Sequence, residues 1–493
     1  MGEKKSIPEP VFKKGGATYE WRCLCQLFFS TRMLDQYFEA QKRLYPQKIK
    51  GRFRRLKWIL NSVFLSIYFF LPFARFNRGE NVTNQAILID LPNSRAYFFF
   101  IEIWPQEVYY LAGILIIAAV ALFFVTSLFG RIWCGYACFQ TVWTDIFIAL
   151  ERLFQGDRND RILLDRKNNF QKFYKKFLTH ASWIIVSILT GYAFTCYFND
   201  AIPFTKNIFN GEINSSALGW ILGIATSTYI MAGFAREHVC TYMCPYSRFQ
   251  SAMFDNNTLI ISYDKKRGED RGKWRQGESF ENRGHCIDCK QCVVVCPTGI
   301  DIRNGLQMEC IACGLCVDAC DNMMTKVGLP KGLIRYDTLA HLIDPIPAKK
   351  FKILKPRTFF YATILILVSG LMLRSLILKP TLEISVIPDR NPIFVKLSDG
   401  SIRNGYLFKI DNKTHERKIF SLKISSPESA ILKLQNGDSQ HLEIAPDSVG
   451  NFKIFTILPL ALVEKNEEGH SLVEFVITDD AESKKVSAIF ISR

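Results

Sequence analysis

Eight of the chain's fifteen cysteines lie within residues 286–320, in two copies of the spacing C-x2-C-x2-C-x3-C. This spacing is typical of ferredoxins with two 4Fe-4S clusters, in which the fourth cysteine of each run binds the cluster of the other run. Pro297 follows the first run as in that pattern, whereas Asp321 stands where a second proline is usual. The predicted ligands are Cys286, Cys289, Cys292 and Cys320 for cluster 1, and Cys296, Cys310, Cys313 and Cys316 for cluster 2.

Zinc is the alternative to iron–sulfur chemistry in this array, because C-x2-C pairs also form structural zinc sites. Two consecutive runs of four cysteines favour the two cubane clusters. Disulfides do not explain the array, since its tight and regular spacing suits metal–thiolate chemistry in a reducing compartment.

Two further cysteine pairs, each with the spacing C-x3-C, directly follow long apolar runs. They occur in "RIWCGYACFQTVW" and "EHVCTYMCPYSRFQ". On one helix, positions i and i+4 share a face, so we expect each pair to present two thiolates together. Four soft ligands suit Cu(I), an iron–sulfur cluster or zinc, and the spacing does not choose among them. We call these four residues the edge thiols: Cys134, Cys138, Cys240 and Cys244.

The remaining candidate ligands are less clearly patterned. His238 and Met243 lie beside the second pair and are additional candidates for its metal, whereas Cys23 and Cys25 form a short N-terminal pair. Buried packing at helix ends is the alternative for any of the isolated pairs, because free cysteine is often buried. His180 lies inside an apolar run, where we expect packing or a hydrogen bond to a neighbouring helix.

Five segments are long and apolar enough to cross about 30 Å of hydrocarbon as helices. They are residues 58–75, 108–130, 177–198, 217–235 and 358–376. The segment 96–104 contains Glu102 and is short, so we expect it to lie at the membrane interface without spanning.

Charges in the connecting segments predict the orientation of these spans. Residues 42–57 hold eight Lys or Arg, residues 152–176 are again basic, and "KKFKILKPR" occupies 349–357. The segments 76–107 and 199–216 hold only two Arg and one Lys, respectively. The positive-inside rule therefore places the N-terminus and the cysteine array in the cytoplasm and the C-terminus outside.

These boundaries predict a multi-domain membrane protein with about five α-helical spans, an α+β dicluster insert and an all-β C-terminal domain. Residues 381–493 contain about eight short alternating runs separated by turn residues, which favours an antiparallel sandwich of immunoglobulin type. The predicted parts are a basic cytoplasmic segment at 1–57, a four-span domain at 58–255, the dicluster domain at 256–350, a fifth span at 351–380 and an external immunoglobulin-like domain at 381–493.

Composition supports a membrane protein and argues against nucleic-acid binding. Apolar residues make up 48% of the chain, and the net charge of +16 is gathered in blocks beside the apolar runs. Nucleic-acid binding proteins instead place basic residues on one stripe or face. The first 30 residues have no apolar core, so no cleavable signal peptide is expected. The chain lacks G-x-G-x-x-G, Walker and C-x-x-C-H motifs, which predicts an external electron donor.

Several stretches resemble the cytochrome c oxidase accessory proteins called CcoG, FixG or RdxA, over nearly the whole chain. They are "YPQKIKGRFRRLKW", "GRIWCGYACFQTVWTD", "EHVCTYMCPYSRFQSAMFD", the ferredoxin array and "IPDRNPIFVKLSDGSIRNGY". The family usually has proline after the cysteine at the position of Cys138, and this chain has Phe139. This departure bears on the geometry of the first pair.

The resemblance implies a bacterial inner-membrane protein that reduces Cu(II) to Cu(I) for assembly of a cbb-type oxidase. Copper at the edge thiols, contacts with copper-handling and oxidase-assembly proteins and with membrane lipid, and a homodimer are the corresponding expectations. Two alternatives remain open. One is an electron-transfer polyferredoxin subunit of quinol-linked respiration, and the other is a redox-sensing assembly scaffold without catalytic activity.

Overall fold

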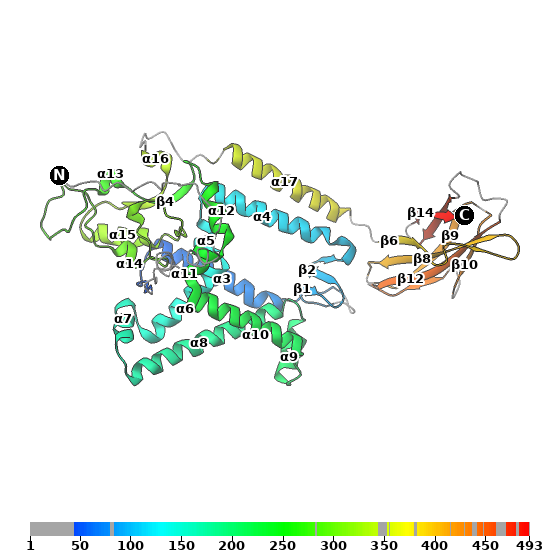
Figure 1. The fold of residues 1–493 in the computed structure, drawn as a ribbon, viewed down its shortest axis with the longest axis horizontal. Coiled ribbons are helices and arrows are strands. Elements are labelled where there is room, and N and C mark those ends of the chain that lie inside the picture. The colour runs from blue at the N-terminus through cyan, green and yellow to red at the C-terminus, as the bar shows by residue number, and fades with distance from the viewer. Residues whose placement is uncertain are drawn as a thin grey trace, which may run out of the picture.

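The computed structural model describes most of the chain after residue 43. The described residues are 44–78, 83–281, 283–343, 353, 355–378, 382–414, 416–427, 429–435, 441–446, 448–459, 470–479 and 483–492. Three parts follow one another along the longest axis: a cysteine-rich part, a group of long helices, and an all-β part at the opposite end (Figure 1). Cys23, Cys25 and most of the predicted segment 1–57 lie outside the described residues.

Five helices are long and apolar enough to cross a membrane, which confirms the predicted number of spans. They cover Arg52–Phe73, Pro105–Phe129, Phe170–Thr195, Ser215–Met243 and Pro356–Ile377. Helices suit this environment because they satisfy every backbone polar group within the segment. Their elements are α3 (Arg52–Phe70), η1 (Leu71–Phe73), η2 (Pro105–Glu107), α4 (Tyr109–Phe129), α8 (Phe170–Thr195), α10 (Ser215–Ile230), η3 (Met231–Ala235), α11 (Arg236–His238), η4 (Val239–Met243) and α17 (Pro356–Ile377).

Shorter helices connect the spans, and most of them lie toward the cysteine-rich end (Figure 1). They are α5 (Ile132–Tyr136), α6 (Phe139–Gln155), α7 (Arg158–Arg166), α9 (Ala201–Phe209) and α12 (Pro245–Met253). Among the long helices, α8 packs against α10 and α4 packs against α17. A Cβ atom on Gly191 of α8 would lie 2.3 Å from the Ile221 carbonyl oxygen of α10. Glycine at this contact lets the two helices approach closely, as is common between membrane helices.

The cysteine-rich part is a small α+β unit between the fourth and fifth spans. Its elements are β4 (Leu259–Tyr263), α13 (Lys265–Gly268), α14 (Gln291–Val294), η5 (Ile302–Asn304), α15 (Leu315–Lys326), β5 (Ile334–Thr338) and α16 (Leu339–Ile343). The strands β4 and β5 pair antiparallel from Leu259 opposite Thr338 to Tyr263 opposite Ile334. Asp318 of α15 is buried and accepts hydrogen bonds from the backbone nitrogens of Phe53 (3.2 Å) and Arg54 (2.8 Å). A carboxylate at a helix N-terminus is favourable, so Asp318 fixes the first span to this unit.

The segment 96–104 does not span, and it forms part of a three-stranded sheet at the end of the helices away from the cysteine-rich unit (Figure 1). The strands are β1 (Ile87–Asp90), β2 (Arg95–Phe98) and β3 (Ile101–Ile103), in the order β1-β2-β3.

The C-terminal part is a sandwich of two antiparallel sheets, which confirms the predicted immunoglobulin-like fold. Its strands are β6 (Leu382–Pro388), β7 (Val395–Lys396), β8 (Ile402–Asn412), β9 (Lys418–Ser426), β10 (Ile431–Leu434), β11 (Leu442–Ile444), β12 (Ser448–Leu458), β13 (His470–Thr478) and β14 (Ser483–Ile491). One sheet has the order β10-β12-β8-β6 with β7 on β8, and the other has β11-β9-β13-β14. Large aromatic side chains fill the space between the sheets, including Phe408, Phe420 and Phe475.

A buried ion pair joins this sandwich to the second span. The Lys413 ammonium lies 2.7 Å from Glu107 of η2 and 2.8 Å from Glu383 of β6. The Gln106 amide donates a hydrogen bond to Asp411 at 3.0 Å. The side chains of Lys413 and Glu107 are only 4% and 5% exposed. Since α4 starts at this contact and leads to Cys134, the sandwich is attached to the helix that positions the first edge pair.

Candidate metal centres

The eight cysteines of the array line two neighbouring cavities, and their grouping matches the predicted ligand sets. One cavity, of about 340 Å³, is lined by the four predicted cluster 2 ligands together with Cys292. The other, of about 360 Å³, is lined by the four predicted cluster 1 ligands. Each set joins three cysteines from one run with one from the other, since Cys320 reaches cluster 1 and Cys296 reaches cluster 2. The assignment of individual ligands stays a prediction.

The cavity linings suit two cubane clusters, since each predicted set joins three cysteines of one run to one of the other. A zinc ion holds sulfur ligands at about 2.3 Å, which draws all of them close together. In a 4Fe-4S cluster each cysteine binds a different iron, so the four sulfurs stand further apart. None of the thirteen described cysteines forms a disulfide, which leaves their thiols available.

Burial controls the protonation of these thiols before a metal binds. It raises the pKa of Cys292, Cys310 and Cys320 to about 12 in each case, and neighbouring cysteines contribute further in all three. Without a metal, these three thiols are therefore neutral, which avoids the cost of burying several unpaired negative charges. Metal binding has to displace these protons. A 4Fe-4S cluster, when bound, supplies one electron at a time.

The two cavities differ in what surrounds them. Cys289, beside cluster 1, is exposed, and the neighbouring Lys290 is exposed as well. Cys313, beside cluster 2, is buried against the membrane part of the molecule. The predicted cluster 1 therefore lies toward solvent, and the predicted cluster 2 lies toward the edge thiols. An electron that enters from solvent would reach cluster 1 first and cluster 2 second.

The edge thiols do not lie on continuous helix faces, so that expectation is wrong. Cys134 lies in α5, but the helix ends before Cys138, which is extended (φ −64°, ψ 128°) and precedes α6 as its N-cap. Cys240 lies in the π-helical turn η4, and Cys244 is again an extended N-cap (φ −80°, ψ 110°), here of α12. Each pair thus joins one helical cysteine to one at a helix N-terminus.

With Phe139 after it, Cys138 still has an extended N-cap backbone similar to that of Cys244. Phe139 is the first residue of α6, as Pro245 is of α12. Proline suits this position because its missing N–H has no partner there in any case, but other residues can occupy it. The Phe139 ring instead lies 4.3 Å from that of Trp143, one turn along α6. Phenylalanine in place of the family's proline therefore leaves the extended N-cap conformation of Cys138 in place.

The two pairs converge on the side of the cysteine-rich unit. Cys134 lies within electrostatic range of Cys138 and Cys240, and Cys240 within range of Cys138 and Cys244. Burial, reinforced by Cys138, raises the pKa of Cys134 to about 12. The structure thus brings all four thiols into one neighbourhood.

Arg131 connects the edge thiols to cluster 2. Its guanidinium donates hydrogen bonds to the carbonyl oxygens of Cys310 (3.2 Å) and Ser247 (2.8 Å) and is only 5% exposed as a residue. Burial lowers the pKa of Arg131, and the nearby Cys134 and Cys310 oppose that effect. This buried cation can balance negative charge on thiolates to either side. The sequence analysis did not predict a role for Arg131. Its position directly after an uncharged span could have marked it as a functional candidate.

Gln250 of α12 is a second functional candidate that the sequence prediction missed. The residue is fully buried, and its Oε1 accepts a hydrogen bond from Cys134 Sγ at 3.3 Å. Its Nε2 has no hydrogen-bond partner within the described residues. A rotation of the amide would let Nε2 donate to a metal-bound thiolate. Nothing in the sequence marked this glutamine, because it meets Cys134 only through the tertiary fold.

The first pair also touches the cluster 2 loop directly. The Tyr136 hydroxyl donates a hydrogen bond to the Cys313 carbonyl oxygen at 3.0 Å. Cys134 packs against the apolar cluster that contains Ile311 and Cys313. A Cβ atom on Gly135 would lie 2.7 Å from the Ile311 carbonyl oxygen, so only glycine allows this approach.

The other candidate ligands of the sequence analysis lie outside the two cavities and the edge thiols. The His180 ring hydrogen-bonds the Tyr229 hydroxyl of α10 at 3.0 Å, as expected of a packed intramembrane histidine. His238 stacks on Tyr242, and Met243 is 58% exposed, so neither lies in a closed site. Cys196 is fully buried and directly follows α8, which ends next to α9 and away from the cysteine-rich unit (Figure 1).

Comparisons with known proteins agree with this architecture. The chain is 40% identical to nitrogen fixation protein FixG of Rhizobium meliloti, over 90% of this chain and 92% of the relative. It is also 40% identical to protein RdxA of Cereibacter sphaeroides, over 87% of this chain and 92% of that relative. The chain belongs to the FixG/RdxA family. A crystal structure of a FixG-related protein from Vibrio parahaemolyticus covers 23% of the chain at 22% identity and a TM-score of 0.20.

Three family models divide the FixG/RdxA chain into its functional parts. A 4Fe-4S dicluster domain matches residues 235–339, a 4Fe-4S binding domain matches 111–156, and the immunoglobulin-like C-terminal fold of FixG matches 372–493. The dicluster match starts before the expected boundary at 256 and includes Cys240 and Cys244. The protein is therefore an iron–sulfur redox protein with several apolar helices, and both edge pairs lie inside iron–sulfur domain matches.

Proposed function

We propose that this FixG/RdxA protein reduces Cu(II) to Cu(I) at the edge thiols, for assembly of a cbb-type cytochrome c oxidase. Each Cu(II) takes up one electron, and an external donor must replace that electron on the protein. Thiolates favour Cu(I) over Cu(II), so a thiol site shifts the equilibrium toward the reduced ion. No dinucleotide motif occurs in the chain, so the donor is a separate molecule.

The direct contact between the cluster 2 loop and the first edge pair is the observation that carries this proposal. Arg131, Gly135 and Tyr136 all meet backbone atoms of residues 310–313. These contacts hold a predicted one-electron centre against four soft ligands, while the exposed Cys289 lies on the other centre. The arrangement gives a donor access at cluster 1 and a metal ion access at the edge thiols.

Membrane orientation is part of the proposal. The basic residues of 44–57 lie at the start of α3, beside the cysteine-rich unit, and the sandwich lies at the opposite end of the helices (Figure 1). By the positive-inside rule the cysteine-rich unit is cytoplasmic and the sandwich periplasmic, in a bacterial inner membrane. Copper-handling and oxidase-assembly proteins are the partners this placement calls for.

The test uses full-length protein purified anaerobically in detergent with about eight iron per chain. The protein is reduced with dithionite, desalted to remove the reductant, and mixed with glycine-buffered Cu(II), and Cu(I) is detected with a bathocuproine chelator. We expect one Cu(I) per electron stored, and loss of the reaction in Cys240→Ala and Cys244→Ala. Cys196→Ala is the matched control, because Cys196 is buried away from the edge thiols. Intact iron–sulfur spectra without Cu(I) formation would contradict the proposal.

Electron transfer in quinol-linked respiration is the second candidate, and one observation favours it. The 4Fe-4S binding domain match at 111–156 contains Cys134 and Cys138. If the four edge thiols held a further cluster, purified protein would contain about twelve iron per chain in place of eight. A twelve-iron protein that oxidises a quinol analogue and forms no Cu(I) would replace copper reduction by this function.

A further inference from the structure

A groove of about 1280 Å³, open to solvent, is lined by five basic side chains and by no acidic side chain of the described residues. It lies between the segment that leads into α3 and the C-terminal half of α6. We call it the basic groove, and its basic residues are Lys48, Lys50, Arg54, Arg55 and Arg152. A concave surface that gathers cations of one sign concentrates positive potential, which favours binding of an anion.

Three of these cations have no partner in the described part of the chain. The side chains of Lys48, Lys50 and Arg55 are exposed and form no ion pair or hydrogen bond with a described residue. Asp157 lies nearby, but it accepts hydrogen bonds from the backbone nitrogen of Lys48 (3.0 and 3.3 Å). Its carboxylate lies 3.9 Å from Arg152 Nε. The two lysines and Arg55 are therefore available to a ligand.

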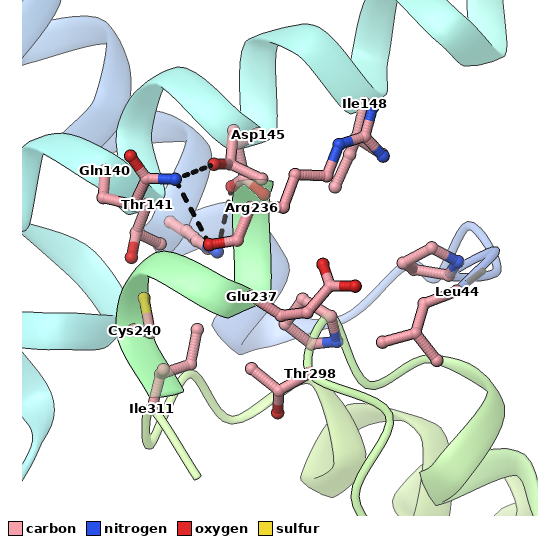
Figure 2. Close-up of a pocket in the computed structure, with 14 residues that line it drawn as sticks. Leu44, Gln140, Thr141, Asp145, Ile148, Arg236, Glu237, Cys240, Thr298 and Ile311 are labelled. Atoms are coloured by element: carbon pink, nitrogen blue, oxygen red, sulfur yellow. Dashed lines mark hydrogen bonds and ion pairs between the residues drawn. The ribbon is translucent and has the colours of Figure 1, made fainter. Parts of the chain in front are cut away.

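The other two cations, Arg54 and Arg152, are more deeply buried and repel each other. Arg54 shares the Asp145 carboxylate with Lys57, at 3.2 and 3.1 Å, so that one carboxylate balances two cations. Asp145 lines a different cavity, of about 480 Å³ (Figure 2). Burial lowers the pKa of Arg152, and the neighbouring Arg54 lowers it further. Arg152 Nε has no hydrogen-bond partner among the described residues, so an anion in the groove would relieve this repulsion.

Apolar side chains continue from the basic groove onto the outer surface of the helices. Trp58 of α3 and Leu153 of α6 line the groove, and both are exposed, Leu153 to 73%. The Arg54 guanidinium lies 4.8 Å from the centroid of the Trp58 ring, so the charged and apolar parts of the groove adjoin. Tryptophan is common where a membrane meets water. A ligand with an anionic head and apolar chains matches both parts of the groove, whereas free phosphate matches only the cations.

We propose that the basic groove binds the phosphate headgroup of an anionic phospholipid from the surrounding membrane. The inference depends on the membrane placement proposed above and is independent of copper reduction. The first apolar helix begins at the groove, with Arg52, which puts the groove at the membrane surface. Basic pockets between helices on the cytoplasmic side suit such headgroups. A headgroup held by both α3 and α6 binds only the folded protein, so it should also raise thermal stability.

The test titrates full-length protein in neutral detergent with phosphatidylglycerol and, separately, with phosphatidylcholine, and counts bound lipids by native mass spectrometry. The deciding variant combines Lys48→Gln, Lys50→Gln and Arg55→Gln, because none of these side chains holds another described part of the protein. Each cation near an anionic lipid surface contributes about fivefold in affinity. We therefore expect roughly 100-fold weaker binding of phosphatidylglycerol, with unchanged iron content and no change for phosphatidylcholine. Arg55→Gln alone, expected to weaken binding about fivefold, decides the question if the triple variant loses its iron.

The matched control removes the same charge from exposed lysines of the cysteine-rich unit, with Lys265→Gln, Lys326→Gln and Lys331→Gln. We expect this control to bind phosphatidylglycerol like the wild type. An equal loss in both triple variants would show that net charge alone attracts the lipid, and would overturn the groove as a site.

Competition separates the two sources of a phosphate group. We expect inorganic phosphate and glycerol 3-phosphate, each in excess, to leave phosphatidylglycerol bound, because neither has acyl chains to cover Trp58 and Leu153. Displacement by either one assigns the groove to a soluble phosphate and overturns the lipid proposal. Wild-type affinity in the groove variants overturns it as well. None of these outcomes bears on Cu(I) formation, which is measured separately.

Discussion

Replacement of Gly135 by alanine tests whether the edge thiols depend on direct contact with the cysteine-rich unit. Gly135 lies between the two cysteines of the first edge pair, in α5. The new Cβ would lie 2.7 Å from the Ile311 carbonyl oxygen, 3.0 Å from that of Ala312 and 3.0 Å from Cys313 Cα. All three atoms belong to the backbone of the loop that carries predicted cluster 2 ligands. The clash can be relieved only if the loop or α5 moves.

The size of the effect follows from two opposing terms. An extra methyl group in a tightly packed interface costs about 1–3 kcal/mol. Alanine is favoured over glycine inside a helix by about 1 kcal/mol, and α5 recovers part of that. The net cost to docking is therefore about 1–2 kcal/mol, or roughly a 5- to 30-fold shift toward a separated arrangement. This is too small to unfold a domain but large enough to weaken the contact.

The assay compares iron content, overall stability and the rate of Cu(I) formation in rapid-mixing experiments. We expect Gly135→Ala to keep its iron and its melting temperature within a few degrees, and to form Cu(I) several-fold more slowly. Hydrogen exchange of residues 310–313 should become faster. Gly223→Ala is the matched control, because a Cβ there meets nothing within 4 Å. If Gly135→Ala behaves like Gly223→Ala in both rate and exchange, the contact does not position the reaction.

Three other predictions concern buried charge and protonation. Asp145→Leu leaves Arg54 and Lys57 buried without their shared anion, so we expect a loss of about 3–5 kcal/mol in stability, measured by thermal unfolding in detergent and smaller in Asp145→Asn. Lys413→Met leaves Glu107 buried without its cation and should speed limited proteolysis between the last span and the sandwich, whereas Arg417→Met, at an exposed pair, should not. In metal-free protein, the raised pKa of Cys134, about 12, means that iodoacetamide labels Cys134 slowly below about pH 11, although the denatured chain reacts from about pH 8.5. Between these values the folded state keeps a proton that the unfolded state loses, so stability falls as pH rises; equal labelling of folded and denatured protein at pH 9 would contradict the shift.

The features that could be predicted from the sequence are those encoded locally. The cysteine runs occupy 35 consecutive residues, from Cys286 to Cys320. An uncharged apolar run longer than 20 residues predicts a membrane span from its own composition alone. The grouping of Cys296 with the second run also follows from a known pattern, and the cavities agree with it.

What could not be predicted depends on contacts between distant segments. Arg131 meets Cys310, and Gln250 meets Cys134, across more than 110 residues of sequence in each case. The expectation of continuous helix faces failed for a different reason. A helix pattern gives no sign that Cys138 and Cys244 would leave the helix and cap the next one, although Pro245 marks such a position at the second pair.

The edge thiols combine two opposing electrostatic effects, and the combination bears on which ions can bind there. Burial keeps Cys134 protonated, whereas the nearby Arg131 guanidinium favours negative charge on the Cys134 sulfur. The buried Cys134 thiol therefore becomes a thiolate only when an incoming cation compensates for the lost proton. A monovalent ion bound by two thiolates carries a net charge of −1, which the Arg131 guanidinium offsets. A divalent ion on the same two thiolates is neutral and gains less from Arg131, whose neighbours also include the Glu309 carboxylate. The fixed cation thus favours retention of the reduced, monovalent state of a metal, the state that one-electron reduction of Cu(II) produces.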